Sequence, residues 1–161
     1  MDDMNRQAVT NPATSCLFDT VYSPKAPRGR GPFPQAVRFG NLLFASGMGP
    51  LDPGRNEPDT GSFEHEVHLT LKNLARVAEA AGCGLANTVK LTIYLSDISN
   101  VPVFNDIYRQ YFSEPLPART LVEVGLRGIQ VEIDGILACP ARPLEADGVG
   151  QEQQSQEQRV R

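Results

Sequence analysis

Residues 117–138, PARTLVEVGLRGIQVEIDGILA, restrict the possible fold more than any other segment of this chain. Thr120–Val124 and Val131–Leu137 are rich in β-branched residues, and a glycine-containing connection separates them. β-Branched side chains pack well on a pleated surface, and glycine favours a tight connection. The segment therefore predicts two β-strands joined by a short turn.

Two charged side chains stand within these apolar strands. Arg119 opens the first strand and, on a period of two, shares a face with Leu121 and Glu123. Glu132 lies in the second strand, on the same face as Asp134. If the two strands are adjacent, the arginine and the carboxylates form either a structural ion pair or a pocket that holds a small carboxylate substrate and moves its protons.

The sequence before this segment shows two different hydrophobic periods. Gln35–Phe39 and Leu42–Ser46 predict a β-hairpin across a Gly-Asn pair, where a positive φ costs little. From Ser62 the period changes from two to about 3.6, which predicts a helix that stops at Gly82. The apolar positions of this helix are Val67, Leu71, Leu74 and Ala78.

Another strand and a second helix follow. Thr88–Leu95 predicts the strand, and Asn100 is expected to cap a helix with an apolar side formed by Val103, Ile107, Tyr108 and Tyr111. The predicted order is ββαβαββ, an α+β domain of two layers with both helices on one face of a mixed sheet. The other face, which bears Val122, Val124 and Ile133, then needs a cover.

Length, charge and cysteine content disfavour several classes of protein. A chain of 161 residues fits one domain, and a formal net charge of -4 disfavours a surface that neutralises nucleic-acid phosphates. Cys16, Cys83 and Cys139 include no CxxC pair, which favours a reducing compartment over a disulfide scaffold or a zinc site. No apolar run approaches the roughly 20 residues needed to span a bilayer. We therefore expect a cytoplasmic protein with a small-molecule partner and no nucleic-acid or membrane partner.

The two ends of the chain differ in composition from the middle. Residues 1–25 show no clear hydrophobic period and predict a flexible N-terminal arm, in which Val21 and Tyr22 can still pair or pack. Residues 26–140 form the predicted domain. Residues 141–161 become acidic and then glutamine-rich, and this composition predicts a disordered tail because it offers too little apolar surface to fold alone.

Several segments resemble the RidA/YjgF family of enamine and imine deaminases, in the order in which they occur there. They are Gly31–Ala36, Leu43–Gly47 with Pro50–Pro53, Val89–Leu95, and Pro117–Thr120 followed by Val131–Ile133. The resemblance covers about residues 26–140. It implies a chorismate-mutase-like fold and a homotrimer whose sheets form a central barrel, with an active site in each cleft between subunits.

The resemblance also implies a reaction and the residues that carry it out. Arg119 matches the arginine that grips the carboxylate of a 2-imino or 2-enamino acid, and a guanidinium suits this role because its planar donors fit a carboxylate. Glu132 matches the carboxylate that activates water, first as general base and then as general acid. The products are a 2-keto acid and ammonia, and the resemblance implies neither a metal nor an organic cofactor.

Four further positions match the family's substrate-binding pocket. Ser46 matches a serine that hydrogen-bonds substrate or water, and the backbone beside Gly47 can supply amide donors. Phe33 stands where the deaminases commonly have tyrosine, so the ring is kept without its hydroxyl. Leu121 replaces a cysteine found in many members, and the turn at residues 126–130 is shorter than usual. These differences favour a larger or more apolar imine, or a specialised one such as an aminomuconate-like acid.

Each of these residues also has a purely structural interpretation. Arg119 can pair with Glu123 or Asp134, and Glu132 can be a solvated or ion-paired strand residue. Phe33 can belong to the core or to an interface. Ser46 next to a glycine is also ordinary turn chemistry.

Two alternatives to a deaminase follow from the same residues. The first is a non-catalytic module of the same fold that binds a small carboxylate. The second is the RNA-directed activity attributed to some relatives, which the acidic charge disfavours. His65 and His68 are spaced to share a metal on one side of a helix, but no third ligand is evident, so no metal site is expected.

Overall fold

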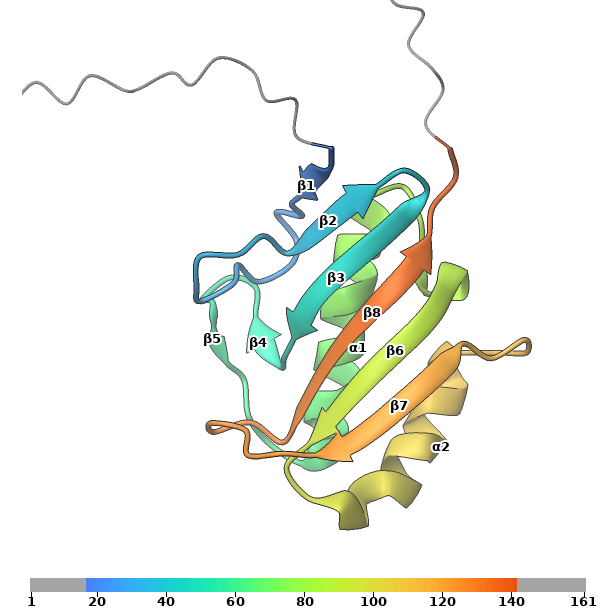
Figure 1. Ribbon diagram of the computed structural model, residues 1–161. Coiled ribbons are helices and arrows are strands. Elements are labelled where there is room, and N and C mark those ends of the chain that lie inside the picture. Colours follow the sequence, from blue (N-terminus) through green and yellow to red (C-terminus); the bar gives the residue numbers. More distant parts are fainter. Residues whose placement is uncertain (1–16, 142–161) are drawn as a thin grey trace, which may run out of the picture.

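The computed structural model describes residues 17–141, which fold into a β-sheet and two helices that cover one of its faces (Figure 1). The strands of the main sheet are β1 (Asp19–Val21), β2 (Ala36–Phe39), β3 (Leu42–Met48), β6 (Thr88–Leu95), β7 (Ala118–Glu123) and β8 (Val131–Ala138). A separate small hairpin consists of β4 (Leu51–Asp52) and β5 (Glu57–Pro58). The helices are α1 (Phe63–Ala80) and α2 (Val101–Tyr111), with short 3-10 turns η1 (Leu85–Asn87) and η2 (Ile98–Asn100). The predicted two-layer α+β fold is confirmed.

The six strands of the sheet lie in the order β1-β2-β3-β8-β6-β7. All neighbours are antiparallel except β6 and β7, which are parallel. The expectation that β7 and β8 are adjacent was wrong, because β6 lies between them. Leu91 of β6 is opposite Arg119 of β7 on one side and opposite Gly135 of β8 on the other. The physical reason is the crossover through α2, which brings β7 back parallel to β6 and leaves only the other edge of β6 for β8.

The hydrophobic core lies between the sheet and the helices. Side chains of β8 alternate between buried and half-buried positions, and Val131, Ile133 and Leu137 face the helices with no exposed surface. Ile133 therefore lies on the covered face, not on the open face where the sequence had placed it. The core is completed from β6 and α1 by Leu91, Ile93, Leu95, Val67, Leu71, Leu74 and Val77.

The ends of α1 follow the sequence, and the start of α2 does not. The Ser62 side chain caps α1 by accepting from the backbone N–H of His65 at 3.3 Å, and Gly82 follows the helix with φ of 79°. The Asn100 side chain makes no capping bond for α2. Instead Asp97 accepts from the backbone N–H of Ser99 at 2.8 Å and starts the 3-10 turn that leads into α2.

The N-terminal strand lies within the segment predicted to be an arm. Val21 pairs with Ala36 across the β1–β2 ladder, and its side chain belongs to the core. The described sheet therefore begins at Asp19. Residues 1–16 and 142–161, to which the rest of the arm and nearly all of the tail belong, lie outside the described residues.

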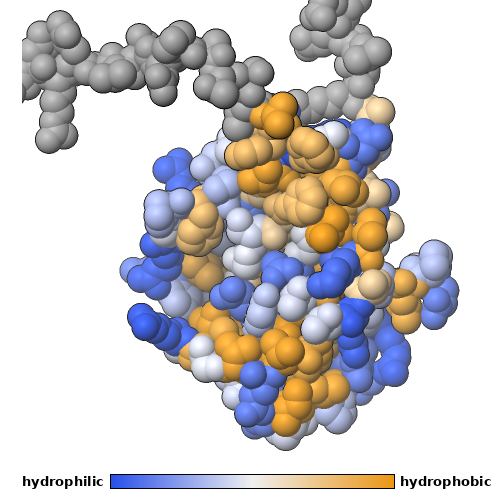
Figure 2. All heavy atoms as spheres, in the orientation of Figure 1, coloured by the Kyte–Doolittle hydropathy of each residue, from blue (hydrophilic) through white to orange (hydrophobic). Residues whose placement is uncertain are grey.

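The face of the sheet opposite the helices is open and partly apolar. Phe39, Leu42 and Phe44 retain 54%, 38% and 40% of their surface exposed, and Val122 on β7 retains 37%. Figure 2 shows this face, with apolar side chains gathered toward both ends of the strands and a more hydrophilic band between them. Within residues 17–141 neither helix has the length and hydrophobicity needed to cross a membrane.

Candidate active site

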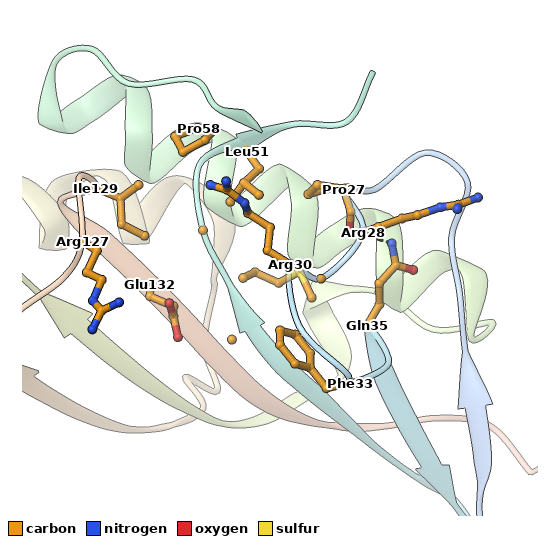
Figure 3. Close-up of a pocket in the computed structure, with 14 residues that line it drawn as sticks. Pro27, Arg28, Arg30, Phe33, Gln35, Leu51, Pro58, Arg127, Ile129 and Glu132 are labelled. Carbon is orange, nitrogen blue, oxygen red and sulfur yellow. Dashed lines mark hydrogen bonds between the residues drawn. The ribbon is translucent and has the colours of Figure 1, made fainter. Parts of the chain in front are cut away.

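A cavity of about 200 Å³ opens mainly between three segments that are distant in sequence, with Pro58 of β5 completing its lining (Figure 3). These segments are the loop before β2, the end of β3 with the residues after it, and the start of β8 with the loop that precedes it. The lining residues are Pro27, Arg28, Gly29, Arg30, Phe33, Gln35, Gly47, Met48, Gly49, Leu51, Pro58, Arg127, Ile129 and Glu132. A cavity of this size suits a metabolite of a few carbon atoms rather than a drug-sized ligand.

Gln35 fixes the path of the loop before β2. Its side chain is buried, its Oε1 accepts from the backbone N–H of Ser23 at 2.6 Å, and its Nε2 lies 3.1 Å from the carbonyl of Ala26 and 2.8 Å from that of Pro27. A buried amide with these partners satisfies backbone groups that the loop would otherwise leave unpaired. The loop therefore enters the site in one defined path.

Phe33 shapes the same loop from inside. A Cβ added to Gly29 would lie 2.6 Å from one edge of the Phe33 ring, and a Cβ added to Gly31 would lie 2.7 Å from the other. The two glycines thus let the backbone pass close to both edges of the ring. Phe33 keeps 47% of its surface exposed and lines the cavity.

Glu132 extends from β8 into the cavity on the open side of the sheet (Figure 3). Burial, and then the negative charge of Asp134 on the same face, raise the pKa of the Glu132 carboxyl above its usual range. Tyr94 Oη donates to Asp134 Oδ2 at 2.7 Å, which holds that second carboxylate in place. A half-buried carboxyl with a raised pKa is suited to accept and return a proton near neutral pH.

Gly47 lies against Glu132. A Cβ at position 47 would lie 2.9 Å from Glu132 Cδ and closer still to Oε1, so a larger residue at position 47 would displace this carboxylate. The sequence had assigned Gly47 to the pocket for its backbone donors. The geometry adds a steric requirement that the sequence did not reveal.

The loop between β7 and β8 is tied to α1. Glu66, which is 1% exposed, accepts from the backbone N–H of Gln130 at 2.7 Å and from its Nε2 at 2.9 Å. This anchor places Arg127 and Ile129 at the rim of the cavity (Figure 3). Neither Arg127 nor Glu66 was predicted to contribute to the site.

Arg119 lies far from this cavity within the chain. Its side chain packs on the helix side of β7, with its guanidinium carbon 5.1 Å from the centre of the Tyr108 ring and its Nη1 donating to Asn105 Oδ1 at 2.8 Å. It lines a separate shallow depression with Asn105, Tyr108, Arg109, Leu116 and Pro117. Arg119 and Glu132 therefore lie on opposite faces of the sheet, with β6 between their strands.

Two other predicted site residues are placed differently from the expectation. The Ser46 hydroxyl donates to the carbonyl of Pro34 at 2.8 Å and so joins β3 to the loop that carries Phe33. Leu121 packs against the core on the helix side, away from Glu132. The structure thus brings together Phe33, Gly47 and Glu132, sets Ser46 behind them and separates Leu121 from them.

Sequence reasoning missed Gln35, Arg30 and Arg127 as contributors to the site. A glutamine at the start of an apolar strand is a usable signal, because a buried amide needs partners. The alternation of arginine and glycine at residues 28–31 was recognised only as too short for a phosphate-binding loop. His65 and His68 contact different groups, Asp59 and Tyr111, and no three potential ligands cluster within residues 17–141.

The family model described as Endoribonuclease L-PSP matches residues 23–139. The 2-iminobutanoate/2-iminopropanoate deaminase of Mus musculus is 37% identical over 125 residues, which are 76% of this chain and 93% of that protein. A RutC family protein of Pyrococcus horikoshii is 35% identical over 122 residues, which are 74% of this chain and 97% of that protein.

A solved structure gives the same result for the fold. The crystal structure of RidA from an Antarctic Psychrobacter has a TM-score of 0.71 and 35% sequence identity, and the match covers 74% of this chain and 98% of that chain. The residues that match the family model, 23–139, include all residues that line the cavity.

Proposed function

This chain belongs to the Endoribonuclease L-PSP family, which includes RidA, and on that premise we propose that it hydrolyses 2-imino or 2-enamino acids to 2-keto acids and ammonia. The observation that supports the proposal most is the half-buried Glu132 carboxyl, which has a raised pKa and faces a small cavity beside Phe33. Relatives named 2-iminobutanoate/2-iminopropanoate deaminase support the same class of reaction.

In the proposed mechanism Glu132 serves twice. It first accepts a proton from a water molecule while the water oxygen attacks C2 of the protonated imine, which gives a neutral carbinolamine. It then returns that proton to nitrogen, and as the C–N bond breaks and ammonia leaves, the carboxylate takes the hydroxyl proton, so that the C2–O bond becomes a carbonyl; this proton passes to the released ammonia. A raised pKa helps the second step because the protonated carboxyl is then a competent acid near neutral pH. No redox step and no external oxidant is required.

The proposed partner for the substrate carboxylate is Arg119 from a second copy of the chain. Within one chain Arg119 and Glu132 lie on opposite faces of the sheet, so no single small molecule touches both. The apolar open face, with Phe39, Leu42 and Phe44 exposed, favours association with further copies. We therefore propose a homotrimer with a central barrel and sites between subunits, as the family resemblance implies.

Ammonia release from freshly generated 2-iminobutanoate tests the reaction. We expect the wild-type chain to accelerate hydrolysis over the spontaneous rate, and Arg119→Ala and Glu132→Gln each to remove most of that acceleration, at least about a hundredfold. Loss of assembly in Arg119→Ala would instead assign Arg119 an architectural role. A wild-type rate equal to the spontaneous rate would refute the proposal.

Mixing the two inactive variants tests whether the site is shared. If each site takes Arg119 from one subunit and Glu132 from its neighbour, random trimers of Arg119→Ala and Glu132→Gln regain about a quarter of the wild-type activity, because about one site in four receives both intact residues. If both residues act within one chain, no mixture regains activity. The second result would exclude a site between subunits.

A binding module without catalysis is the second candidate. It is favoured by Phe33, which lacks a phenolic hydroxyl in the cavity, and by Leu121, which faces the core. Binding of a 2-keto acid without acceleration of imine hydrolysis would support it. A cytoplasmic location, a small-molecule partner and the absence of a nucleic-acid partner remain proposals that rest on the net charge of -4 and the family resemblance.

A further inference from the structure

Three arginines line the cavity of a chain that is acidic overall. They are Arg28, Arg30 and Arg127, and Glu132 is the carboxylate among the lining residues. The formal net charge of the chain is -4, so a local excess of positive charge is not a general property of this surface. A cavity with more cations than anions favours a ligand that carries more than one negative charge.

These arginines have no hydrogen-bond or ion-pair partner in the part of the chain that the structure describes. The other arginines of residues 17–141 all have one: Arg38, Arg55, Arg76, Arg109 and Arg119 contact backbone carbonyls, carboxylates or asparagine side chains. The unpaired guanidinium groups are thus concentrated at one place. Their donors are available to a ligand.

Two of the three point toward the cavity. In Figure 3 the Arg127 side chain lies beside Glu132, and the Arg30 side chain crosses the site toward Leu51, whereas the Arg28 side chain extends away. No ion pair joins either Arg30 or Arg127 to Glu132 among the described residues. Arg30 and Arg127 are therefore the candidate ligand-binding pair.

Both arginines are carried by loops with defined positions. The glycines on either side of Arg30 pack on the Phe33 ring, and Gln35 holds the start of the same loop. The loop of Arg127 is tied to the buried Glu66 through Gln130. Anchored loops reduce the entropy that each guanidinium loses when it binds an anion.

We propose that the substrate is a dicarboxylic 2-imino acid, whose side-chain carboxylate is bound by Arg30 and Arg127. This inference rests on the proposed deaminase function and names its substrate class. Arg119 of a neighbouring copy is assigned to the carboxylate next to the imine, so the cavity's own arginines are free for the second one. The cavity of about 200 Å³ suits a four- or five-carbon diacid.

The test compares two five-carbon imines that differ at one end. An amino-acid oxidase generates 2-iminoglutarate from glutamate and 2-iminopentanoate from norvaline, and ammonia release gives kcat/KM for each. We expect the wild-type chain to prefer the diacid by about tenfold, as a charge-assisted hydrogen bond allows. The double variant Arg30→Gln/Arg127→Gln should lose that preference, measured as the ratio of the two kcat/KM values.

Matched variants separate binding of the second carboxylate by Arg30 and Arg127 from a general effect of removing a positive charge from the protein. Arg55→Gln removes an exposed arginine that pairs with Asp52 on the β4–β5 turn, and it should keep the preference for the diacid. Arg127→Lys keeps the charge without the planar fork and should retain part of the preference. The proposal is overturned if the wild-type chain turns over both imines equally, or if the double variant still prefers the diacid.

Binding of products distinguishes failure of this inference from failure of the deaminase proposal. If neither imine is hydrolysed, the deaminase proposal fails, and calorimetric titration with 2-oxoglutarate and 2-oxopentanoate still measures the charge preference. Tighter binding of 2-oxoglutarate that disappears in the double variant supports the arginine site. Equal binding overturns it, as does tighter binding of inorganic phosphate than of 2-oxoglutarate.

Discussion

At the scale of single residues, the candidate site depends on the small volume of Gly47 and on the environment of Glu132. The carboxylate of Glu132 occupies the space that a side chain at position 47 would fill. Burial and the charge of Asp134 raise the pKa of the Glu132 carboxyl, and Tyr94 donates a hydrogen bond to Asp134. The steric effect of Gly47 and the electrostatic effect of Asp134 can be tested separately.

Gly47→Ala should reduce imine hydrolysis at least about tenfold while the chain still folds, because the group displaced is the movable end of a side chain. The measurement is kcat/KM together with the melting temperature. Gly84→Ala is the matched control, since a Cβ at Gly84 meets no atom within 4 Å. Equal activity of the two variants would show that Glu132 does not need its present position.

The pH dependence of kcat/KM should report the raised pKa of Glu132. A general base works only when deprotonated, so activity should fall with decreasing pH at a higher pH than for an ordinary glutamate. Asp134→Asn removes a charge that raises this pKa, and the acid limb should move to lower pH. Tyr94→Phe keeps the negative charge of Asp134 and removes only the hydrogen bond to it, so the acid limb of this variant should not move to lower pH. An unchanged limb in Asp134→Asn would contradict the assignment.

At the scale of elements, segments that are distant in sequence meet at the ends of α1 and β8. Arg38 of β2 lies in this region, where it donates to the carbonyls of Ala81 and Pro140 at 3.0 Å and 2.5 Å. Cys83 follows α1 and Cys139 follows β8, and their sulfur atoms lie 2.6 Å apart. The sequence spacing had favoured unpaired cysteines, and the fold brings two of the three together as free thiols.

Oxidation with diamide should convert Cys83 and Cys139 to a disulfide, as the two thiols lose two protons and two electrons to the reagent. Burial, and then the neighbouring Cys139 thiol, raise the pKa of Cys83 to about 12, so the reaction should be faster at higher pH, where more thiolate is present. The cross-link spans 56 positions and should stabilise the fold by about 4 kcal/mol.

Mass spectrometry under non-reducing conditions and thermal unfolding measure this outcome. Cys16→Ser keeps the pair and should form the same cross-link, whereas Cys83→Ser should not form it. A cross-link that joins Cys16 to either of the other cysteines, or no change in melting temperature on oxidation, would contradict the prediction.

At the scale of the whole molecule, the sheet has one covered and one open face. The helices bury the core residues of β6 and β8, and the open face keeps Phe39, Leu42 and Phe44 partly exposed (Figure 2). An exposed apolar face of this kind favours association. Arg119 and Glu132 of one chain cannot contact the same small substrate. A second copy packed on the open face would therefore also be needed to complete the proposed site.

If the proposed trimer forms through this face, Phe44→Lys should convert it to monomers, because the charge would be buried without a partner in the interface. Light scattering coupled to size-exclusion chromatography measures the mass. Ile98→Lys is the control, since Ile98 is 48% exposed in the turn before α2, away from the open face. Unchanged assembly in Phe44→Lys, or dissociation in both variants, would argue against an interface at this face.

The local sequence determined most of the elements of this chain. Hydrophobic period and caps predicted α1 between Ser62 and Gly82, the hairpin of β2 and β3, and β6 at its observed bounds, because these features depend on neighbours in the chain. The alternation in β8 likewise placed Glu132 and Asp134 on one face of the strand, and the structure shows that this is the face opposite the core. Family motifs pointed to the cavity residues Phe33 and Gly47.

Only the tertiary structure decided which strands are neighbours and which side chains meet. Strand pairing depends on crossovers and edges, and these have no local signal, so β6 between β7 and β8 separated Arg119 from Glu132 against the expectation. Arg30 and Arg127 are 97 positions apart in the chain and lie on two different loops, yet both line the cavity. Gln35 anchors the loop of Arg30, and Glu66 anchors the loop of Arg127. Such contacts arise from packing of the whole domain, because a loop's position is set by partners that are remote in sequence.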